Sequence, residues 1–346
     1  MGEFELLAKL RERLPAGGPR VELGSGDDAA VTVPGGATAT SVDAIVEGVH
    51  FRRGEVGLET IGRKALATAL SDLAAMGAEA GEAYVALGAP GDLGEDEFLT
   101  LLDGMLALAA ETGTTLAGGD LTRAPALILA VTVVGHAQKP EQLVSRGGAR
   151  PGDLVVLTGK IGGAAAGRLL LDDSELATAV PTSVAKDLRK RQLDPSPRLQ
   201  TGRALAAAGA RAMIDLSDGL AGDAGHLAAA SGVALQIEAG SLPLATGVAE
   251  VATAAGLDPL QLAASGGEDY ELLATLPSDA LADASARAAA AGESSLTPVG
   301  KVTGGEGVEI RLPGGGRLEV AGYDHFADFA EPSRGSRSEA RGHRDG

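Results

Sequence analysis

Acidic residues stand beside glycine or serine at six places in the sequence, and groups of this kind can bind cations. These places are Gly26-Asp27-Asp28, Ser41-Val42-Asp43, Ser71-Asp72, Gly118-Gly119-Asp120, Asp215-Leu216-Ser217-Asp218-Gly219 and Gly266-Gly267-Glu268-Asp269. Taken singly, each has a structural explanation, because Asp and Gly form turns and Asp or Ser cap helices. Because six such groups occur, an alternative explanation is that their carboxylates meet in one site.

Three of these aspartates are hard to explain as turn residues. Asp72 lies inside a helical run whose same-face neighbours are small or apolar, so its carboxylate needs a partner such as a cation. Asp43 and Asp120 each end an apolar, strand-like run, which is the usual location of ligand-binding groups in α/β folds. We therefore predict a cluster of carboxylates.

Such a cluster suits magnesium and phosphate together. Mg²⁺ takes oxygen ligands, commonly one or two carboxylates with waters and substrate phosphates, so several aspartates would suit several ions. An acidic protein also needs such ions to accept a nucleoside triphosphate, since its carboxylates would otherwise repel the phosphates. The metal and phosphate interpretations support each other.

Other phosphate-binding patterns are weak or absent. The sequence has no G-x-x-x-x-G-K-[ST] loop, which excludes a P-loop ATPase. The run 159–163 (GKIGG) lacks the G-x-G-x-x-G spacing, so we predict only a turn between a strand and a helix. Arg146 could be solvated or could hold a phosphate, and a lone imidazole such as His50 is by default a surface or hydrogen-bonded group.

Composition excludes several classes of function. Aromatic residues make up 2% of the 346 residues and the formal net charge is −18, which disfavours nucleic acid as a partner. The chain has no Cys, which rules out disulfides and thiolate metal sites and fits a reducing cytosol. The longest apolar stretch, 126–134, is too short to span a membrane, and residues 1–14 form a charged amphipathic pattern rather than a signal peptide. We expect a cytoplasmic protein.

The elements that must position these residues alternate between strands and Ala-rich helices, the pattern of an α/β or α+β fold. Helices are predicted at 58–76, 95–112 and 217–231, and strands at 37–42, 83–87, 126–134, 154–157, 233–237 and 271–275. The stretch 137–152, rich in Gln, Pro, Gly and Arg, indicates a domain boundary. We expect an N-terminal domain at 1–138, a C-terminal domain at 139–330 and a disordered tail at 331–346.

Seven motifs, in order along the chain, resemble the thiamine-monophosphate kinase family. They are 23–30 (LGSGDDAA), 46–51 (VEGVHF), 70–78 (LSDLAAMGA), 118–120 (GGD), 214–220 (IDLSDGL), 265–272 (SGGEDYEL) and 322–326 (GYDHF). The resemblance implies a two-domain fold like that of aminoimidazole ribonucleotide synthetase, with an N-terminal ATP- and magnesium-binding domain that dimerises through its sheet. It also implies a homodimer that uses ATP and several Mg²⁺ ions to convert thiamine monophosphate to thiamine diphosphate.

The same resemblance assigns roles residue by residue. It implies metal ligands at Asp28, Ser41, Asp43, Asp72, Asp120, Asp215 and Asp218. It implies that ATP is held by Gly119, Asp120, Arg146 and Ser217, and that thiamine monophosphate meets His50, Glu268 and Tyr323. Val42 stands where the family often has Thr and is left out of the site. No general base or covalent nucleophile is expected.

Two other interpretations stay open at the level of sequence. A selenophosphate synthetase-like enzyme of the same superfamily commonly uses Cys or selenocysteine near its N-terminus, and the lack of Cys counts against it. A non-catalytic protein that binds nucleotide or thiamine phosphate is the other, and the full set of aspartates disfavours it. Release of ADP that depends on thiamine monophosphate would separate an enzyme from a binding protein.

Overall fold

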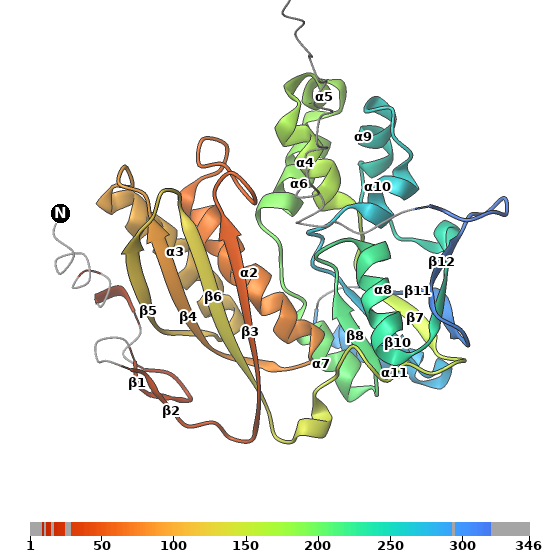
Figure 1. Ribbon diagram of the computed structural model, residues 1–346, viewed down its shortest axis with the longest axis horizontal. Helices are drawn as coiled ribbons and strands as arrows, with labels where there is room; N and C mark the ends of the chain where they lie inside the picture. Colours follow the sequence, from red (N-terminus) through yellow and green to blue (C-terminus); the bar gives the residue numbers. More distant parts are fainter. Residues whose placement is uncertain (1–8, 10–11, 15–16, 25–28, 293–294, 320–346) are drawn as a thin grey trace, which may run out of the picture.

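Two β-sheets, each packed with helices, organise the computed structural model of the chain (Figure 1). The structure describes residue 9 and residues 12–14, 17–24, 29–292 and 295–319. The predicted tail at 331–346 lies outside this range, as does most of the amphipathic N-terminal segment.

The first sheet has the strand order β3-β6-β4-β5. Its strands are β3 (Ala37–Val46), β4 (Glu79–Ala89), β5 (Thr115–Arg123) and β6 (Ile128–Ala137). Strands β3 and β4 run antiparallel to β6, whereas β4 and β5 are parallel. A short ribbon of β1 (Val21–Leu23) and β2 (Val31–Thr32) precedes it.

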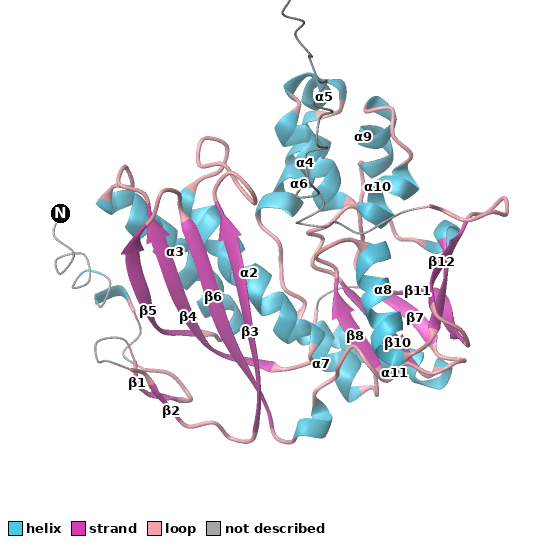
Figure 2. Cartoon of the chain, viewed as in Figure 1, coloured by secondary structure: helices cyan, strands magenta, loops and turns pink. Residues whose placement is uncertain are grey.

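Helices α2 (Leu58–Ala75) and α3 (Glu95–Thr112) cover one face of this sheet (Figure 2). Alternation along β6 explains this, because Leu129, Val131 and Val133 are buried toward the helices while the residues between them are only partly buried. Helix α2 is buried along most of its length, since α3, the sheet and the second domain all pack on it. It is therefore the central element that both halves of the chain share.

The second sheet has the strand order β12-β9-β11-β7-β10-β8, with only β9 and β12 parallel. Its strands are β7 (Leu154–Thr158), β8 (Ala212–Asp215), β9 (Ala234–Glu238), β10 (Leu272–Leu276), β11 (Leu296–Thr303) and β12 (Gly307–Arg311). The central strands β7 and β10 are buried and mostly apolar because both of their faces are covered.

Eight helices accompany the second sheet within the described residues. They are α4 (Gly163–Asp172), α5 (Ser174–Ala179), α6 (Thr182–Leu193), α7 (Leu199–Ala207), α8 (Leu220–Ser231), α9 (Val248–Ala254), α10 (Pro259–Ser265) and α11 (Leu281–Ala290). Short 3₁₀ turns occur at Pro140–Gln142, Ala239–Ser241 and Ser278–Ala280. Helix α7 packs on α2, so the main apolar core continues from one half of the chain into the other.

The predicted α/β architecture is confirmed, and most predicted elements are present. The run 159–163 is the expected turn between β7 and α4. Two details differ: Asp43 lies inside β3, which continues to Val46, and Asp120 lies inside β5, which continues to Arg123, whereas both were expected at the end of a strand. Exposed and partly buried residues alternate along β3, and its polar residues interrupt the apolar pattern. A count of consecutive apolar residues therefore underestimates the length of the strand.

Candidate active site

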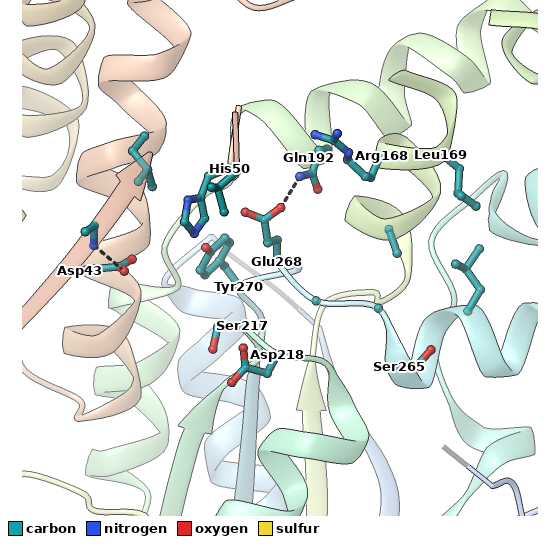
Figure 3. Close-up of a pocket in the computed structure, with 17 residues that line it drawn as sticks. Asp43, His50, Arg168, Leu169, Gln192, Ser217, Asp218, Ser265, Glu268 and Tyr270 are labelled. Carbon is teal, nitrogen blue, oxygen red and sulfur yellow. Dashed lines mark hydrogen bonds between the residues drawn. The ribbon is translucent and has the colours of Figure 1, made fainter. Parts of the chain in front are cut away.

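A cavity of about 520 Å³ lies between the domains that contain the two sheets, and residues of both domains line it (Figure 3). Strand β3 and the loop after it contribute Asp43 and His50. The loops after β8 and before β10 contribute Ser217, Asp218 and Glu268. A smaller cavity of about 230 Å³ holds the other candidate ligands, namely Ser41, Asp72, Arg146 and Asp215.

The register of β3 explains why Ser41 and Asp43 reach this region. They pair with Val133 and Val131 of β6, whose side chains are buried toward the helices, so both point to the α2 side of the sheet. There the Ser41 hydroxyl donates a hydrogen bond to the carboxylate of Asp72. Ser41 and Asp43 lie two positions apart on one strand face, which makes the two cavities neighbours.

Asp72 and Asp215 come from different domains and meet at the base of the site. Ser71, beside Asp72 on α2, donates a 2.7 Å hydrogen bond to Asp215 at the end of β8. Asp215 is 4% exposed, and burial raises its pKa to about 7, with the nearby charge of Asp72 adding to the effect. Burial also raises the pKa of Asp72, an effect that the Ser41 hydrogen bond opposes.

Asp223 joins this acidic group, although sequence analysis did not select it. It lies in the first turn of α8, is almost fully buried, and accepts a 3.1 Å hydrogen bond from the backbone N–H of Asp218. Burial, and then the charges of Asp215 and Asp218, raise its pKa to about 8. Its spacing of five residues from Asp218 was the available signal, but an acidic residue in a first helical turn is common for other reasons.

Arg146 supplies positive charge to the same region. It is exposed, it lines the smaller cavity, and its charge opposes the rise that burial causes in the pKa values of Asp72, Asp215 and Asp223. A guanidinium in this place can bind phosphate oxygens with two parallel hydrogen bonds. Ser217 lines the larger cavity, and its side chain is half-buried.

His50 and Glu268 form the opposite wall of the larger cavity (Figure 3). The backbone N–H of Val46 donates to Nδ1 of His50 at 3.1 Å, so a neutral His50 ring carries its proton on Nε2. The Glu268 carboxylate accepts a hydrogen bond from Gln192 and pairs with Lys64 at 3.0 Å. Sequence analysis missed Lys64 and Gln192, because a lysine in a helix and a glutamine near a helix end are ordinary surface patterns.

Gly119 and Asp120 lie on β5 and line neither of the two cavities. Asp120 on β5 pairs with Ala86 of β4, which pairs in turn with Ala130 of β6 and so belongs to the face not covered by α2 and α3. Asp43 points to the other face and lies on the opposite edge strand, three strand spacings or about 14 Å away. One chain therefore does not bring Asp120 to the other candidate ligands.

Two predicted site residues, Asp28 and Tyr323, lie outside the described residues. Within the part of the chain that is described, no group of three or more His, Asp or Glu side chains is arranged as a complete metal cage. The donors present still suit Mg²⁺, which usually keeps several waters and takes only one or two carboxylates per ion plus substrate phosphates. Asp72 and Asp215 are like-charged carboxylates that lie close enough for the charge of Asp72 to raise the Asp215 pKa, so they are the pair that a divalent cation would best stabilise.

Comparison with known proteins agrees with this two-domain fold. The AIR synthase related protein family matches twice, with its N-terminal domain over residues 26–137 and its C-terminal domain over residues 150–313. The fold and the cleft between its domains thus define an AIR synthase related protein.

Relatives narrow this class further. The thiamine-monophosphate kinase of Escherichia coli K12 is 38% identical over 94% of this chain and 98% of its own length, and that of Mycobacterium tuberculosis H37Rv is 38% identical over 79% and 80%. The solved structure of the enzyme from Stenotrophomonas maltophilia K279a has a TM-score of 0.76 at 37% identity, covering 89% of this chain and 94% of that one. The chain belongs to the thiamine-monophosphate kinase family.

One solved relative carries ligands. It is described as AaThiL complexed with AMPPCP and TMP, and it matches with a TM-score of 0.73 and 28% identity over 94% of this chain and 97% of that one.

No helix among the described residues is long and apolar enough to cross a membrane.

Proposed function

We propose that this protein transfers the γ-phosphate of ATP to thiamine monophosphate, giving thiamine diphosphate and ADP, with Mg²⁺ bound by its aspartates. The observation that carries the proposal is the meeting of Asp72 and Asp215 across the domain boundary, beside a cavity that holds His50 and Glu268. The family relationship and the ligands named for AaThiL support the same reaction. A cavity of about 520 Å³ is within the usual range for small-molecule sites.

The chain's own residues divide between the two substrates. Arg146 and Ser217 would hold the nucleotide phosphates, next to carboxylates that would bind Mg²⁺. His50 would donate from Nε2 to the acceptor phosphate, and Glu268 would face the positively charged thiazolium ring. Bound Mg²⁺ would offset the charge of two phosphate groups that must approach each other.

No protein base is needed for this reaction. The acceptor is a phosphate monoester whose second pKa is about 6, so near neutral pH it is mostly a dianion and already a nucleophile. One of its oxygens forms a bond to the γ-phosphorus while the bond from that phosphorus to the β–γ bridging oxygen breaks, and ADP leaves with that oxygen. The protein's task is alignment and charge stabilisation.

We also propose that the active form is a homodimer joined through the open face of the first sheet. No helix covers this face among the described residues, and it carries exposed apolar side chains, with Val42 64% exposed and Ala44 and Ala86 exposed beside it. Asp120 lies on the same face. A dimer through this face could carry Asp120 of one protomer to the aspartates of its partner.

The reaction is tested directly by measuring ADP release with and without thiamine monophosphate, in Mg²⁺ and in excess EDTA. We expect turnover only when the acceptor and the divalent cation are both present. A protein that binds both ligands without releasing ADP would be a non-catalytic binding protein. With ATP that is chiral at a γ-thiophosphate, a single in-line transfer must invert the configuration at phosphorus, and retention would refute the direct mechanism.

The cellular location follows from the same proposal. We propose a cytoplasmic enzyme, because its co-substrate is ATP and its lack of Cys fits a reducing compartment. Fractionation of cells that express the tagged chain would check this.

A further inference from the structure

Lys64 on α2 is a buried lysine whose ammonium group contacts three acceptors. The residue is 2% exposed. Its Nζ lies 3.0 Å from Oε1 of Glu268, 3.1 Å from the carbonyl oxygen of Gln192 and 3.5 Å from the carbonyl oxygen of His50. The contacts with the two carbonyl oxygens are hydrogen bonds, whereas the contact with Glu268 is an ion pair, because Oε1 of Glu268 is buried and accepts no hydrogen bond among the described residues.

All three acceptors belong to residues that line the larger cavity. His50 follows β3 in the first domain, Gln192 lies near the end of α6, and Glu268 precedes β10. Figure 3 shows Glu268 between His50 and Gln192, and we call these three residues the acceptor wall. Lys64 contacts the acceptor wall without being among the residues that line the cavity. One buried charge therefore joins three segments that are distant in sequence.

Stability alone does not account for this arrangement. Removing an ammonium group from water costs several kcal/mol, and well-packed apolar residues often serve a buried position as well as an ion pair does. A Met at position 64 would fill a similar volume on a helix that is already buried among Leu and Ala side chains. What an apolar side chain could not supply is a fixed direction for the carboxylate of Glu268.

Glu268 needs this support because its backbone is strained. Its φ is +66°, in the left-handed region that favours glycine, and such a residue persists only where its surroundings hold it there. Lys64 contacts one carboxylate oxygen, and the side-chain amide of Gln192 donates to the other. Since an ionised carboxylate only accepts, the Gln192 amide nitrogen must face it, which leaves Oε1 of Gln192 buried and without a hydrogen-bond partner.

We propose that Lys64 is a positioning residue for the acceptor substrate. It holds the Glu268 carboxylate, the His50 loop and the end of α6 in the geometry that binds thiamine monophosphate, and it does not contact the nucleotide side of the site. This inference rests on the proposed function, because it takes the acceptor wall to be the binding surface of thiamine monophosphate.

The test compares Lys64→Met with Arg63→Met in steady-state kinetics, varying each substrate in turn. Arg63 is the matched control: it is the adjacent residue on α2 and also links the domains, through a 3.1 Å ion pair with Asp194, but neither residue lines the cavity. For Lys64→Met we expect KM for thiamine monophosphate to rise about tenfold or more, the size expected when a buried carboxylate loses its charged partner. We expect KM for ATP to change less than about twofold in the same variant. Arg63→Met should change neither KM by more than that.

A double-mutant cycle shows whether Lys64 acts through Glu268. In a Glu268→Gln background, Lys64→Met should raise KM for thiamine monophosphate by less than about twofold, because the carboxylate that it positions is already gone. Full additivity of the two substitutions would contradict action through Glu268. Equal rises of both KM values in Lys64→Met, or a rise of the same size in Arg63→Met, would show that Lys64 only joins the domains.

The outcomes separate this inference from the proposed function. Wild-type turnover in the same assay reports on the proposed function, whereas the ratio between the two KM changes reports on Lys64. If Lys64→Met does not fold, Lys64→Gln keeps a donor and similar length and should show the same selective rise. A wild-type enzyme that is inactive with thiamine monophosphate would overturn both proposals together.

Discussion

The hydroxyl of Ser71 and the carboxylate of Asp215 are 144 residues apart in sequence, and a 2.7 Å hydrogen bond joins them. This bond ties α2 of the first domain to the end of β8 in the second. It also fixes the neighbouring Asp72 close enough to Asp215 for its charge to raise the Asp215 pKa. The acidic centre of the site thus exists only while the two domains stay docked.

Asp72→Asn and Asp218→Asn should each lower kcat at saturating ATP and thiamine monophosphate. Asparagine keeps the size of the side chain but loses the charge that would bind Mg²⁺, so we expect a loss of about 100-fold or more, as when one charge-stabilising group is removed from an active site. Asp283→Asn on the exposed surface of α11 is the control and should retain wild-type kcat. Retention of half the activity in Asp72→Asn would count against its role as a ligand.

Stability without metal should fall as the pH rises. The pKa of Asp223 is 3.8 in the unfolded chain and about 8 in the fold, so the folded protein binds this proton more tightly than the unfolded chain does. The resulting contribution is fully present below pH 3.8 and is lost as the pH rises toward 8; Asp215, with a pKa of about 7, acts in the same direction. Denaturant titrations in EDTA between pH 5 and 8.5 would measure how the free energy of unfolding changes with pH. This is roughly the range over which Asp215 and Asp223 ionise.

Asp223→Asn should reduce that slope and stabilise the metal-free protein at high pH. The amide oxygen of Asn can still accept from the Asp218 N–H, while the repulsion from Asp215 and Asp218 is removed. We expect a gain of about 1 kcal/mol at pH 8, or roughly 2–4 °C in Tm. An unchanged pH slope in this variant would show that Asp223 is not the group responsible.

Gly159→Ala should destabilise the second domain. Gly159 has a φ of +53°, and an added Cβ would overlap the buried carboxylate of Glu271, which accepts hydrogen bonds from Arg198 at 2.6 and 2.9 Å. Gly152→Ala separates the two causes, because Gly152 also has a positive φ, +97°, but open space around it. Unfolding by urea should show a loss of about 3 kcal/mol or more at Gly159 and about 1 kcal/mol at Gly152. Equal losses would leave backbone strain as the whole cause.

Mixing two inactive variants would test whether Asp120 serves the partner's site. If it does, a dimer of one Asp120→Asn protomer and one Asp72→Asn protomer contains one complete site. Random exchange of subunits makes half of the dimers mixed, so about a quarter of the wild-type rate should return. If all ligands of a site came from one chain, the mixture would stay inactive.

Val42→Glu, which places a charge on the open sheet face, should lower the molar mass measured by light scattering to that of a monomer.

Local pattern was enough to predict much of the fold. The helix at 95–112 has the predicted bounds, and that at 58–76 ends one residue early, because amphipathic spacing and the following glycines mark their ends in the sequence. Strand lengths were less certain, as β4 extends from Glu79 to Ala89 around a predicted core of 83–87. Period-two alternation is easily hidden when a strand carries glycine and acidic residues.

The sequence by itself determined which residue types could bind cations and phosphate, and its ordered motifs pointed to the family to which the chain belongs. Only the tertiary structure decided which of them meet. Asp72 and Asp215 do so because α2 packs against β8, whereas strand register sends Asp120 to the far face of its sheet. Lys64, Gln192 and Asp223 could not be found in advance, because burial and a shared cavity, rather than residue type or spacing, make them part of the site. Contacts between residues distant in the chain arise from the packing of whole elements, which local sequence patterns do not record.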